Sequence, residues 1–335
     1  MRYDRVRFGI VGAGAISQGY GQAFQGCGEA VAVAVADTRL DAAKSLGEVL
    51  GCPAFTSHAA MADACELDAV LICTPPSSHA EICLDFIDRG VNVLCEKPFT
   101  VTVAEAETVV CTAREKGVKI TMASKFRYVD DVIRAKQIVD SGILGDVVLF
   151  DNAFTARVDM SRRWNSDPTI SGGGVLIDNG THSVDIARYF LGPLSGVHVM
   201  EGRRSQGLKV EDTVQVFVRS ERGAMGTIDL SWSINKELER YISIYGSQGT
   251  VIVGWKKSRY RQASSPDWVS FGTGYDKVRA FRNQIVNFSR AIRGDDVLLI
   301  DGTDALASVR VVDAAYQSLQ QNHWISVSNG ASATA

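Results

Sequence analysis

The sequence has 335 residues, of which 46% are hydrophobic and 22% charged, and its formal net charge is −3. Because this length exceeds what one hydrophobic core usually serves, we expect two domains. The balanced charge, without a long basic run or basic residues interleaved with aromatic ones, argues against a nucleic-acid-binding surface. No apolar run approaches the roughly 20 residues of a membrane span, and the stretch Met1 to Arg5 lacks a signal-peptide pattern. We therefore expect a cytoplasmic protein that does not enter a membrane.

All seven cysteines lie within the first 111 residues, and no two of them form a C-x-x-C pair. Several fall in apolar strand or helix patterns, where a free cysteine behaves as a small hydrophobic residue. This usage favours a reducing compartment and argues against a disulfide framework or a zinc site. We expect no metal site.

A glycine-rich turn follows the first apolar strand, which we expect at 6–11. With a helical pattern behind it, the turn is close to the dinucleotide fingerprint, in which Ser17 takes the place of the third glycine. Gly12 permits the tight turn, Gly14 lets the backbone approach a pyrophosphate, and Ser17 is small enough for the helix to pack on the strand. The start of the helix, at Ala15 and Ile16, is then expected to offer its amides to the phosphates.

An acidic residue follows the second strand, expected at 31–36, and this residue is Asp37. A carboxylate here can accept hydrogen bonds from the ribose hydroxyls of NAD, and it repels the 2′-phosphate of NADP. Arg39 is able instead to reach such a phosphate or to lie against the adenine, so we expect NAD without excluding NADP. Thr38 between them is counted with the cofactor contacts. Asp37 is equally well placed to cap a helix at 40–50.

Two further strands, expected at 69–73 and 91–97, also end in polar loops. The loop after the first contains Thr74, Pro75 and His79, and we expect it to touch the ribose or nicotinamide end of the cofactor. The alternative for His79 is that it stands at the start of a helix and makes only local hydrogen bonds, without contacting the cofactor. The second strand ends at Glu96-Lys97-Pro98, because a proline cannot donate to a sheet ladder.

Lys97 then stands where open α/β sheets bind ligands, just outside the carboxyl ends of the strands. The alternative is an ordinary strand end with two solvated charges. Helices expected at 80–89 and 103–116, and a strand at 119–123, continue the alternation of strand and helix. This regularity predicts a parallel, doubly wound sheet.

After Ser124 the pattern changes to longer strands in which polar and apolar residues alternate. An amphipathic helix is expected at 131–141, and strands are expected at 146–154, 197–203, 212–219, 225–233 and 240–245. The turn signals between some of them favour an antiparallel meander with one face covered by helices and the other open. We expect the open face to serve as a subunit interface, and the small-residue tail 328–335 to fray.

A second informative stretch runs from Gly172-Gly173-Gly174 to His182. Three glycines before a helix let its start approach a ligand closely. Asp178 and His182 are four residues apart and therefore share one face of that helix. Gly180 lowers helix stability, which suggests crowding by another chain or a ligand. The alternative is a capped helix with an ordinary surface pair, and a metal site lacks further ligands.

Together these motifs resemble the Gfo/Idh/MocA family of sugar and cyclitol oxidoreductases, over about 6–316. The most specific marks are Glu96-Lys97-Pro98 and the stretch from Gly172 to His182. Two family motifs are altered: Pro76 replaces the asparagine of the Thr-Pro-Asn-x-x-His loop, and Arg127-Tyr128-Val129-Asp130 lacks the proline of Arg-Phe-x-Pro.

The resemblance implies an N-terminal Rossmann domain (1–124) with a doubly wound parallel sheet and a C-terminal α/β domain (125–327) with a large open, mainly antiparallel sheet. Family members commonly pair through that sheet as homodimers or homotetramers. The resemblance also implies hydride transfer between a nicotinamide cofactor and a secondary hydroxyl of a sugar, cyclitol or sugar derivative. Two other functions stay open: glycoside cleavage through transient oxidation by a tightly held NAD, and a regulator that binds NAD without turnover.

By the same resemblance, Lys97, Asp178 and His182 form the catalytic trio. We expect Lys97 and His182 to bracket the reacting hydroxyl as acid and base, and Asp178 to orient one of them or an adjacent hydroxyl. Glu96 is expected to position Lys97 or to contact the cofactor, and Lys97 itself is also counted with the cofactor contacts. The predicted substrate contacts are Lys97, Arg127, Tyr128, Arg157, Trp164, Asp178 and His182.

Overall fold

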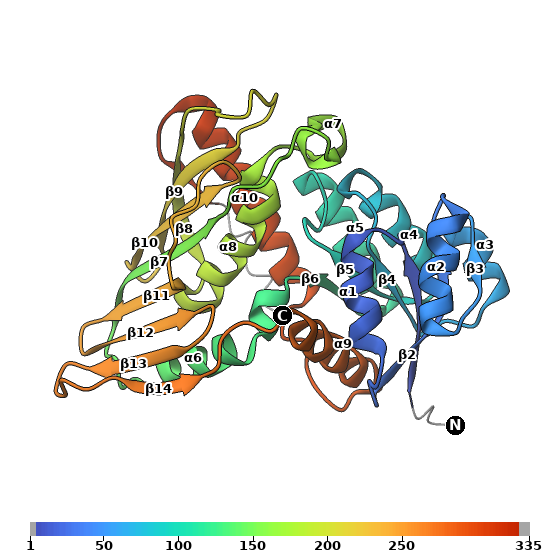
Figure 1. Cartoon of the computed structure of the whole chain (residues 1–335), viewed down its shortest axis with the longest axis horizontal. Helices are drawn as coiled ribbons and strands as arrows, with labels where there is room; N and C mark the ends of the chain where they lie inside the picture. Colours follow the sequence, from blue (N-terminus) through green and yellow to red (C-terminus); the bar gives the residue numbers. More distant parts are fainter. Residues whose placement is uncertain (1–4, 328–335) are drawn as a thin grey trace. The chain divides into compact units, whose positions relative to one another are not determined.

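The computed structural model describes residues 5–327 and divides the chain into two compact units (Figure 1). The first unit comprises Met1–Tyr128 and Asp276–Leu306, and the second comprises Val129–Tyr275 and Ala307–Ala335. The predicted tail lies outside the described residues. The segment 276–306, which the sequence analysis assigned to the second domain, is thus part of the first unit.

Six parallel strands form the sheet of the first unit, in the order β3-β2-β1-β4-β5-β6. The elements are β1 (Val6–Val11), α1 (Ala15–Phe24), β2 (Ala30–Ala36), α2 (Leu40–Leu50), β3 (Ala54–Phe55), α3 (His58–Ala64), β4 (Ala69–Ile72), α4 (His79–Asp88), β5 (Asn92–Glu96), α5 (Val103–Lys116) and β6 (Ile120–Ala123). The strand order reverses between β1 and β4, which is where doubly wound sheets bind ligands. The predicted parallel, doubly wound sheet is confirmed.

Helix α9 (Lys277–Arg293) lies late in the sequence, after the strands of the second unit, and packs against α1 of the first (Figure 1). Its buried side chains include Phe281, Ile285 and Phe288, which recur at the spacing of one helix face. Phe281 stacks on Tyr20 with ring centroids 4.0 Å apart, and Phe288 lies 6.1 Å from Phe8 of β1. This apolar stripe completes the core of the first unit, which explains why 276–306 belongs there.

An ion pair near the end of α9 predicts a pH-dependent contribution to stability. Arg290 donates to Oε1 of Glu29 from Nε at 3.0 Å, and Arg293 contacts Oε2. These arginines lower the pKa of Glu29 in the folded protein. Because the folded pKa lies below the unfolded value, the pair stabilises the fold above the unfolded pKa, and this contribution is lost as the pH falls through the folded pKa.

We therefore expect Glu29→Gln to lower the Tm at neutral pH by an amount that corresponds to about 1 kcal/mol or less, since the pair is partly exposed. The Tm difference between wild type and variant should shrink towards zero as the pH is lowered through the acid range. Thermal unfolding followed by circular dichroism measures both curves. A difference that stays constant down to the lowest pH at which the protein folds contradicts this role for Glu29.

Nine strands form the sheet of the second unit, in the order β14-β13-β12-β11-β7-β10-β9-β8-β15. Its elements are α6 (Asp130–Asp140), β7 (Val147–Thr155), α7 (Pro168–Ser171), α8 (Val175–Leu191), β8 (Leu194–Glu201), β9 (Thr213–Ser220), β10 (Met225–Ser231), β11 (Arg240–Gly246), β12 (Gly249–Gly254), β13 (Ser258–Gln262), β14 (Val269–Gly272) and β15 (Ile325–Ser326). Helix α10 (Gly302–Gln321) begins in the first unit's segment and ends in the second's. All strand pairs are antiparallel except β7 with β10, so the predicted mainly antiparallel sheet is confirmed.

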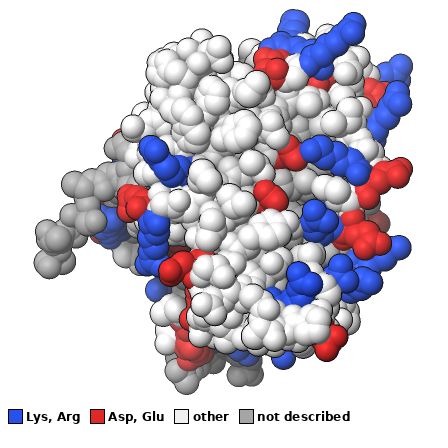
Figure 2. Space-filling model, turned by 90° about the vertical axis from the view of Figure 1, so that its left-hand side faces the viewer, with Lys and Arg blue, Asp and Glu red and all other residues white. Residues whose placement is uncertain are grey.

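Helices α6 and α8 pack against one face of this sheet, and the other face is open (Figure 1). Met225 and Leu149 are exposed neighbours in adjacent strands on the open face. Figure 2 looks onto this side of the molecule, where white, uncharged areas lie between scattered Lys, Arg, Asp and Glu side chains. Pairing of subunits through this face stays a prediction. Within residues 5–327, no helix is long and apolar enough to cross a membrane.

Candidate functional site

The turn after β1 has the geometry that the fingerprint predicts. Gly12 has a φ of +96°, and a Cβ there would lie 2.7 Å from the backbone that follows β4, so only glycine fits. Gly14 precedes α1 without a side-chain cap, and no atom lies within 4 Å of the place where its Cβ would be. Ser17 is buried and donates its hydroxyl to the carbonyl of Gly14 at 2.7 Å. The first turn of α1, at Ala15 and Ile16, therefore has room and uncapped amides for a phosphate.

Two backbone amides hold the carboxylate of Asp37, directly after β2. Oδ2 accepts from the N–H of Ala13 at 2.7 Å, and Oδ1 accepts from the N–H of Arg39 at 2.8 Å. The N-cap of α2 is Arg39, so Asp37 does not cap that helix. Thr38 and Arg39 are exposed, and Nε of Arg39 lies 3.5 Å from Asp37. A carboxylate fixed beside the glycine turn fits the ribose of NAD.

His79 joins two loops at the same edge of the sheet. Its buried imidazole lies with Nδ1 2.8 Å from the carbonyl oxygen of Pro98 and Nε2 2.9 Å from that of Thr74. Burial lowers the pKa of His79, while the two carbonyls and the carboxylate of Glu96 oppose this shift. The contact with Thr74 is local, whereas the contact with Pro98 reaches the loop after β5. The exposed Pro75 lies in the loop that His79 anchors.

The carboxylate of Glu96 points into the first unit. Strand β5 ends at Glu96, one residue earlier than predicted, and the side chain is only 6% exposed. Oε1 accepts from the hydroxyl of Tyr20 at 2.9 Å, and Oε2 accepts from the backbone N–H of Lys97 at 3.0 Å. Of the two roles expected for Glu96, this geometry favours support of Lys97 over contact with a cofactor.

In the second unit, Asp178 and His182 both lie on α8, as their spacing predicts. His182 is 5% exposed, and Asp178 is half-buried. A Cβ on Gly180 would lie 3.1 Å from Cδ1 of Leu230 on β10. The crowding at Gly180 therefore comes from the sheet of its own unit, and the expectation that another chain or a ligand causes it is wrong.

The glycines before α8 also serve packing within the unit. A Cβ on Gly173 would lie 1.9 Å from the hydroxyl of Tyr316, and one on Gly174 would lie 2.1 Å from the carbonyl oxygen of Glu211. Oε1 of Glu211 accepts from the N–H groups of Gly174 and Leu176 at 2.9 and 3.0 Å and from the hydroxyl of Tyr316 at 2.8 Å. Burial raises the pKa of Glu211 against these donors. The close approach expected of a ligand is thus made by Glu211 and Tyr316.

The remaining predicted substrate residues differ in exposure. Arg127 is buried, with one guanidinium nitrogen 3.3 Å from the carbonyl oxygen of Leu299 and 3.4 Å from Asp304. Tyr128 is also buried, and its hydroxyl lies 3.3 Å from Asn287 Oδ1. Both side chains thus contact the returning segment 276–306. Arg157 and Trp164 of the second unit are exposed, and substrate contact by any of the four stays a prediction.

Four residues with clear structural roles escaped the sequence analysis, namely Tyr20, Gln284, Glu211 and Tyr316. Tyr20 and Gln284 are 264 positions apart, and Glu211 and Tyr316 are 105 apart. Each looks like an ordinary member of its own segment, so no local pattern marks it. Only the pairing of distant segments shows their roles.

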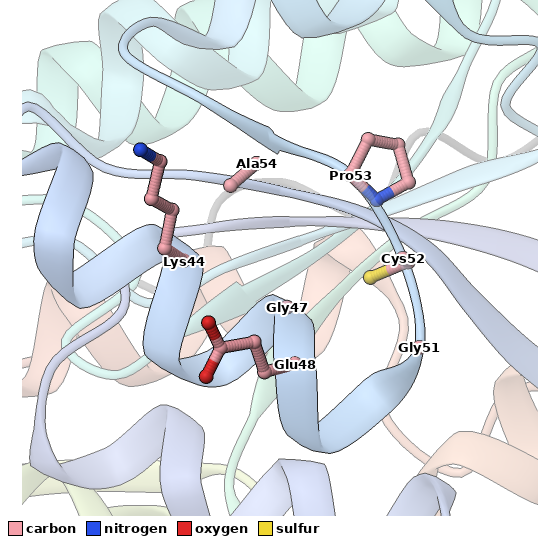
Figure 3. Close-up of a pocket in the computed structure, with 7 residues that line it drawn as sticks. All are labelled: Lys44, Gly47, Glu48, Gly51, Cys52, Pro53 and Ala54. Carbon is pink, nitrogen blue, oxygen red and sulfur yellow. The ribbon is translucent and has the colours of Figure 1, made fainter.

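A shallow pocket of about 360 Å³ lies away from all these residues (Figure 3). It is lined by the last turns of α2, with Lys44 and Glu48, and by the loop with Cys52 that leads into β3. This is the amino end of the parallel strands, opposite the edge that carries Gly12 and Asp37. Among residues 5–327, no three His, Cys, Asp or Glu side chains are grouped to hold a metal ion.

Comparison with known families agrees with this geometry. Residues 6–124 match the model of an oxidoreductase family with an NAD-binding Rossmann fold, and residues 132–252 match the GFO/IDH/MocA C-terminal domain. The chain belongs to the GFO/IDH/MocA family. The resemblance identified from the motifs is confirmed, and the protein is an NAD-binding oxidoreductase.

Similar proteins cover nearly the whole chain. It is 27% identical to inositol 2-dehydrogenase of Rhizobium meliloti, across 96% of this chain and 99% of the relative. It is 23% identical to D-apiose dehydrogenase of Paraburkholderia graminis, across 96% of this chain and 89% of the relative. The structure of levoglucosan dehydrogenase in complex with NADH shares the fold, with a TM-score of 0.90 and 20% identity over 97% of this chain and 99% of that one.

Proposed function

We propose that this protein transfers a hydride between NAD and a secondary hydroxyl of a sugar, cyclitol or sugar derivative. One observation carries the proposal: Lys97 follows β5 at the edge of the sheet where the glycine turn follows β1 and Asp37 follows β2. In a parallel sheet, these positions share the ligand-binding edge. The relatives named as dehydrogenases of inositol and apiose support a polyhydroxylated substrate.

Oxidation of a secondary alcohol requires a base near its hydroxyl proton. NAD, when bound, supplies the hydride acceptor. We propose Lys97 and His182 as the acid–base groups, with Asp178 orienting one of them or an adjacent hydroxyl of the substrate. A lysine serves as a base only where its surroundings lower its pKa, whereas an imidazole titrates near neutral pH without such tuning. For the substrate itself, the proposed contacts include Arg127, Tyr128, Arg157 and Trp164.

The first experiment is an assay of NAD reduction by the purified protein with a panel of sugars, cyclitols and their acids. Turnover with one substrate class establishes the dehydrogenase. Absence of turnover across the panel, with NAD still bound, refutes the proposal for free polyols. Release of an aglycone from a glycoside without net change of NAD would then identify the cleavage reaction, and its absence would identify a regulator.

The position of Asp37 predicts the choice of cofactor. We expect Asp37→Ser to raise the KM for NAD about ten- to hundredfold, since a hydrogen bond to a charged group contributes about 1.5 to 3 kcal/mol. The KM for NADP should fall in the same variant, because the carboxylate that repels the 2′-phosphate is gone and Arg39 remains. Steady-state kinetics with both cofactors measures the ratio. An unchanged ratio would show that Asp37 does not face the ribose.

We also propose a cytoplasmic homodimer or homotetramer that pairs through the open face of the nine-stranded sheet. The exposed apolar side chains of Met225 and Leu149, which are cross-strand neighbours on this face, support the pairing. The seven free cysteines support a reducing compartment. Light scattering of the wild type and of Met225→Arg tests the interface, because an added charge on this face should shift the protein towards the monomer.

A further inference from the structure

We propose that Tyr20 and Gln284 are positioning residues for Lys97, which they support through the buried carboxylate of Glu96. The inference rests on the proposed function of Lys97. The three supporting side chains come from α1, β5 and α9, which all belong to the first unit. Neither Tyr20 nor Gln284 belongs to a motif of the sequence. Their role becomes visible only because α9 packs against α1.

The chain of contacts begins at the backbone of Lys97. Its N–H donates to Oε2 of Glu96 at 3.0 Å, and the other oxygen of that carboxylate accepts from the hydroxyl of Tyr20 at 2.9 Å. Tyr20 is fully buried. Its burial, and then the negative charge of Glu96, raise the pKa of Tyr20 well above its ordinary value. The phenol therefore keeps its proton at neutral pH and donates it to Glu96.

Gln284 completes the chain from the far side of Tyr20. The side chain is fully buried, and its amide oxygen lies 3.0 Å from the tyrosine hydroxyl. A phenol has one proton, and Tyr20 already gives it to Glu96. While the amide oxygen of Gln284 faces the hydroxyl of Tyr20, the amide nitrogen Nε2 has no hydrogen-bond partner among residues 5–327. Turning the amide over lets its NH₂ donate to the oxygen of Tyr20, and the amide oxygen then takes the position that has no partner.

This arrangement fixes the start of the loop that carries Lys97. A buried carboxylate is stable only while donors surround it, and loss of the Tyr20 hydroxyl leaves Oε1 of Glu96 without its side-chain donor. The carboxylate must then turn to find another donor, and this change weakens its bond to the N–H of Lys97. His79 holds the next residue, Pro98, so the displacement is concentrated at Lys97. Catalytic groups tolerate little displacement, since an error of about 1 Å can cost a hundredfold in rate.

The test compares two variants that remove a polar group with one that removes only packing. Tyr20→Phe deletes the hydroxyl, and Gln284→Met keeps the length of the side chain without the amide. The matched control is Phe281→Leu, which removes the ring that stacks on Tyr20 at 4.0 Å but no hydrogen bond. We expect both polar variants to lower kcat about tenfold. Their KM values for NAD should stay within about twofold of wild type. The control should lower the Tm without lowering kcat.

A second measurement needs no substrate. Hydrogen exchange followed by mass spectrometry reports the N–H of Lys97 in a peptide covering residues 95–101, and we expect exchange there about tenfold faster in both polar variants but not in Phe281→Leu. Turnover and exchange equal to wild type in both polar variants would overturn the inference. Absence of turnover in wild type with every substrate would instead count against the proposed function, while the exchange measurement still decides whether the network holds Lys97.

Discussion

Replacing Lys97 by methionine is expected to lower kcat about a hundredfold or more, the usual contribution of a positioned acid–base group. Methionine has a similar length and apolar stem but can neither carry nor transfer a proton. The dissociation constant for NAD should change little, because the fingerprint turn and Asp37 remain in place. Steady-state kinetics and a titration with NAD measure both quantities. His182→Ala should give a loss of the same order.

The control for Lys97→Met is Lys44→Met, in the pocket at the opposite edge of the same sheet (Figure 3). Lys44 is exposed, and we expect its replacement to leave kcat unchanged. Near-normal turnover in both Lys97→Met and His182→Ala would contradict the proposed chemistry. A loss in only one of them would assign the acid–base role to that residue.

Removal of the Glu211 carboxylate is expected to give the largest loss of stability. In Glu211→Ala, two buried donors and one partly buried donor lose their acceptor at the start of α8, and each unsatisfied group costs about 1 to 3 kcal/mol. We therefore expect the free energy of unfolding to fall by about 3 kcal/mol or more. Urea denaturation followed by circular dichroism measures it. Because α8 carries Asp178 and His182, activity should fall together with stability.

Two further variants keep this prediction testable. Tyr316→Phe removes one of the three donors and should cost about 1 kcal/mol even if Glu211→Ala does not fold. Glu239→Ala deletes an exposed carboxylate of the same unit and should change the free energy of unfolding by less than about 0.5 kcal/mol. Equal effects of Glu211→Ala and Glu239→Ala would show that Glu211 does not stabilise the start of the helix.

Several features of this protein were determined by local sequence. Gly12 could be assigned to its turn because a positive φ and a close backbone contact admit only glycine there. The alternation of apolar strands with helical patterns was enough to predict the parallel sheet, since strand and helix differ in hydrophobic period. Asp178 and His182 share a helix because their spacing is close to one helical turn. Each of these signals is local, because it depends only on residues that are close to one another in the sequence.

Tertiary structure alone decided the rest. The apolar stripe of α9 shows that the helix must be buried, but not that it packs on α1 of the first unit. Gly173 and Gly180 are small because Tyr316 and Leu230 lie against them, and neither partner is near in sequence. The contacts of Tyr20 with Gln284 likewise join segments that carry no common pattern. Periodicity records whether a side chain is buried, whereas the identity of its partner depends on which distant segments the fold brings together.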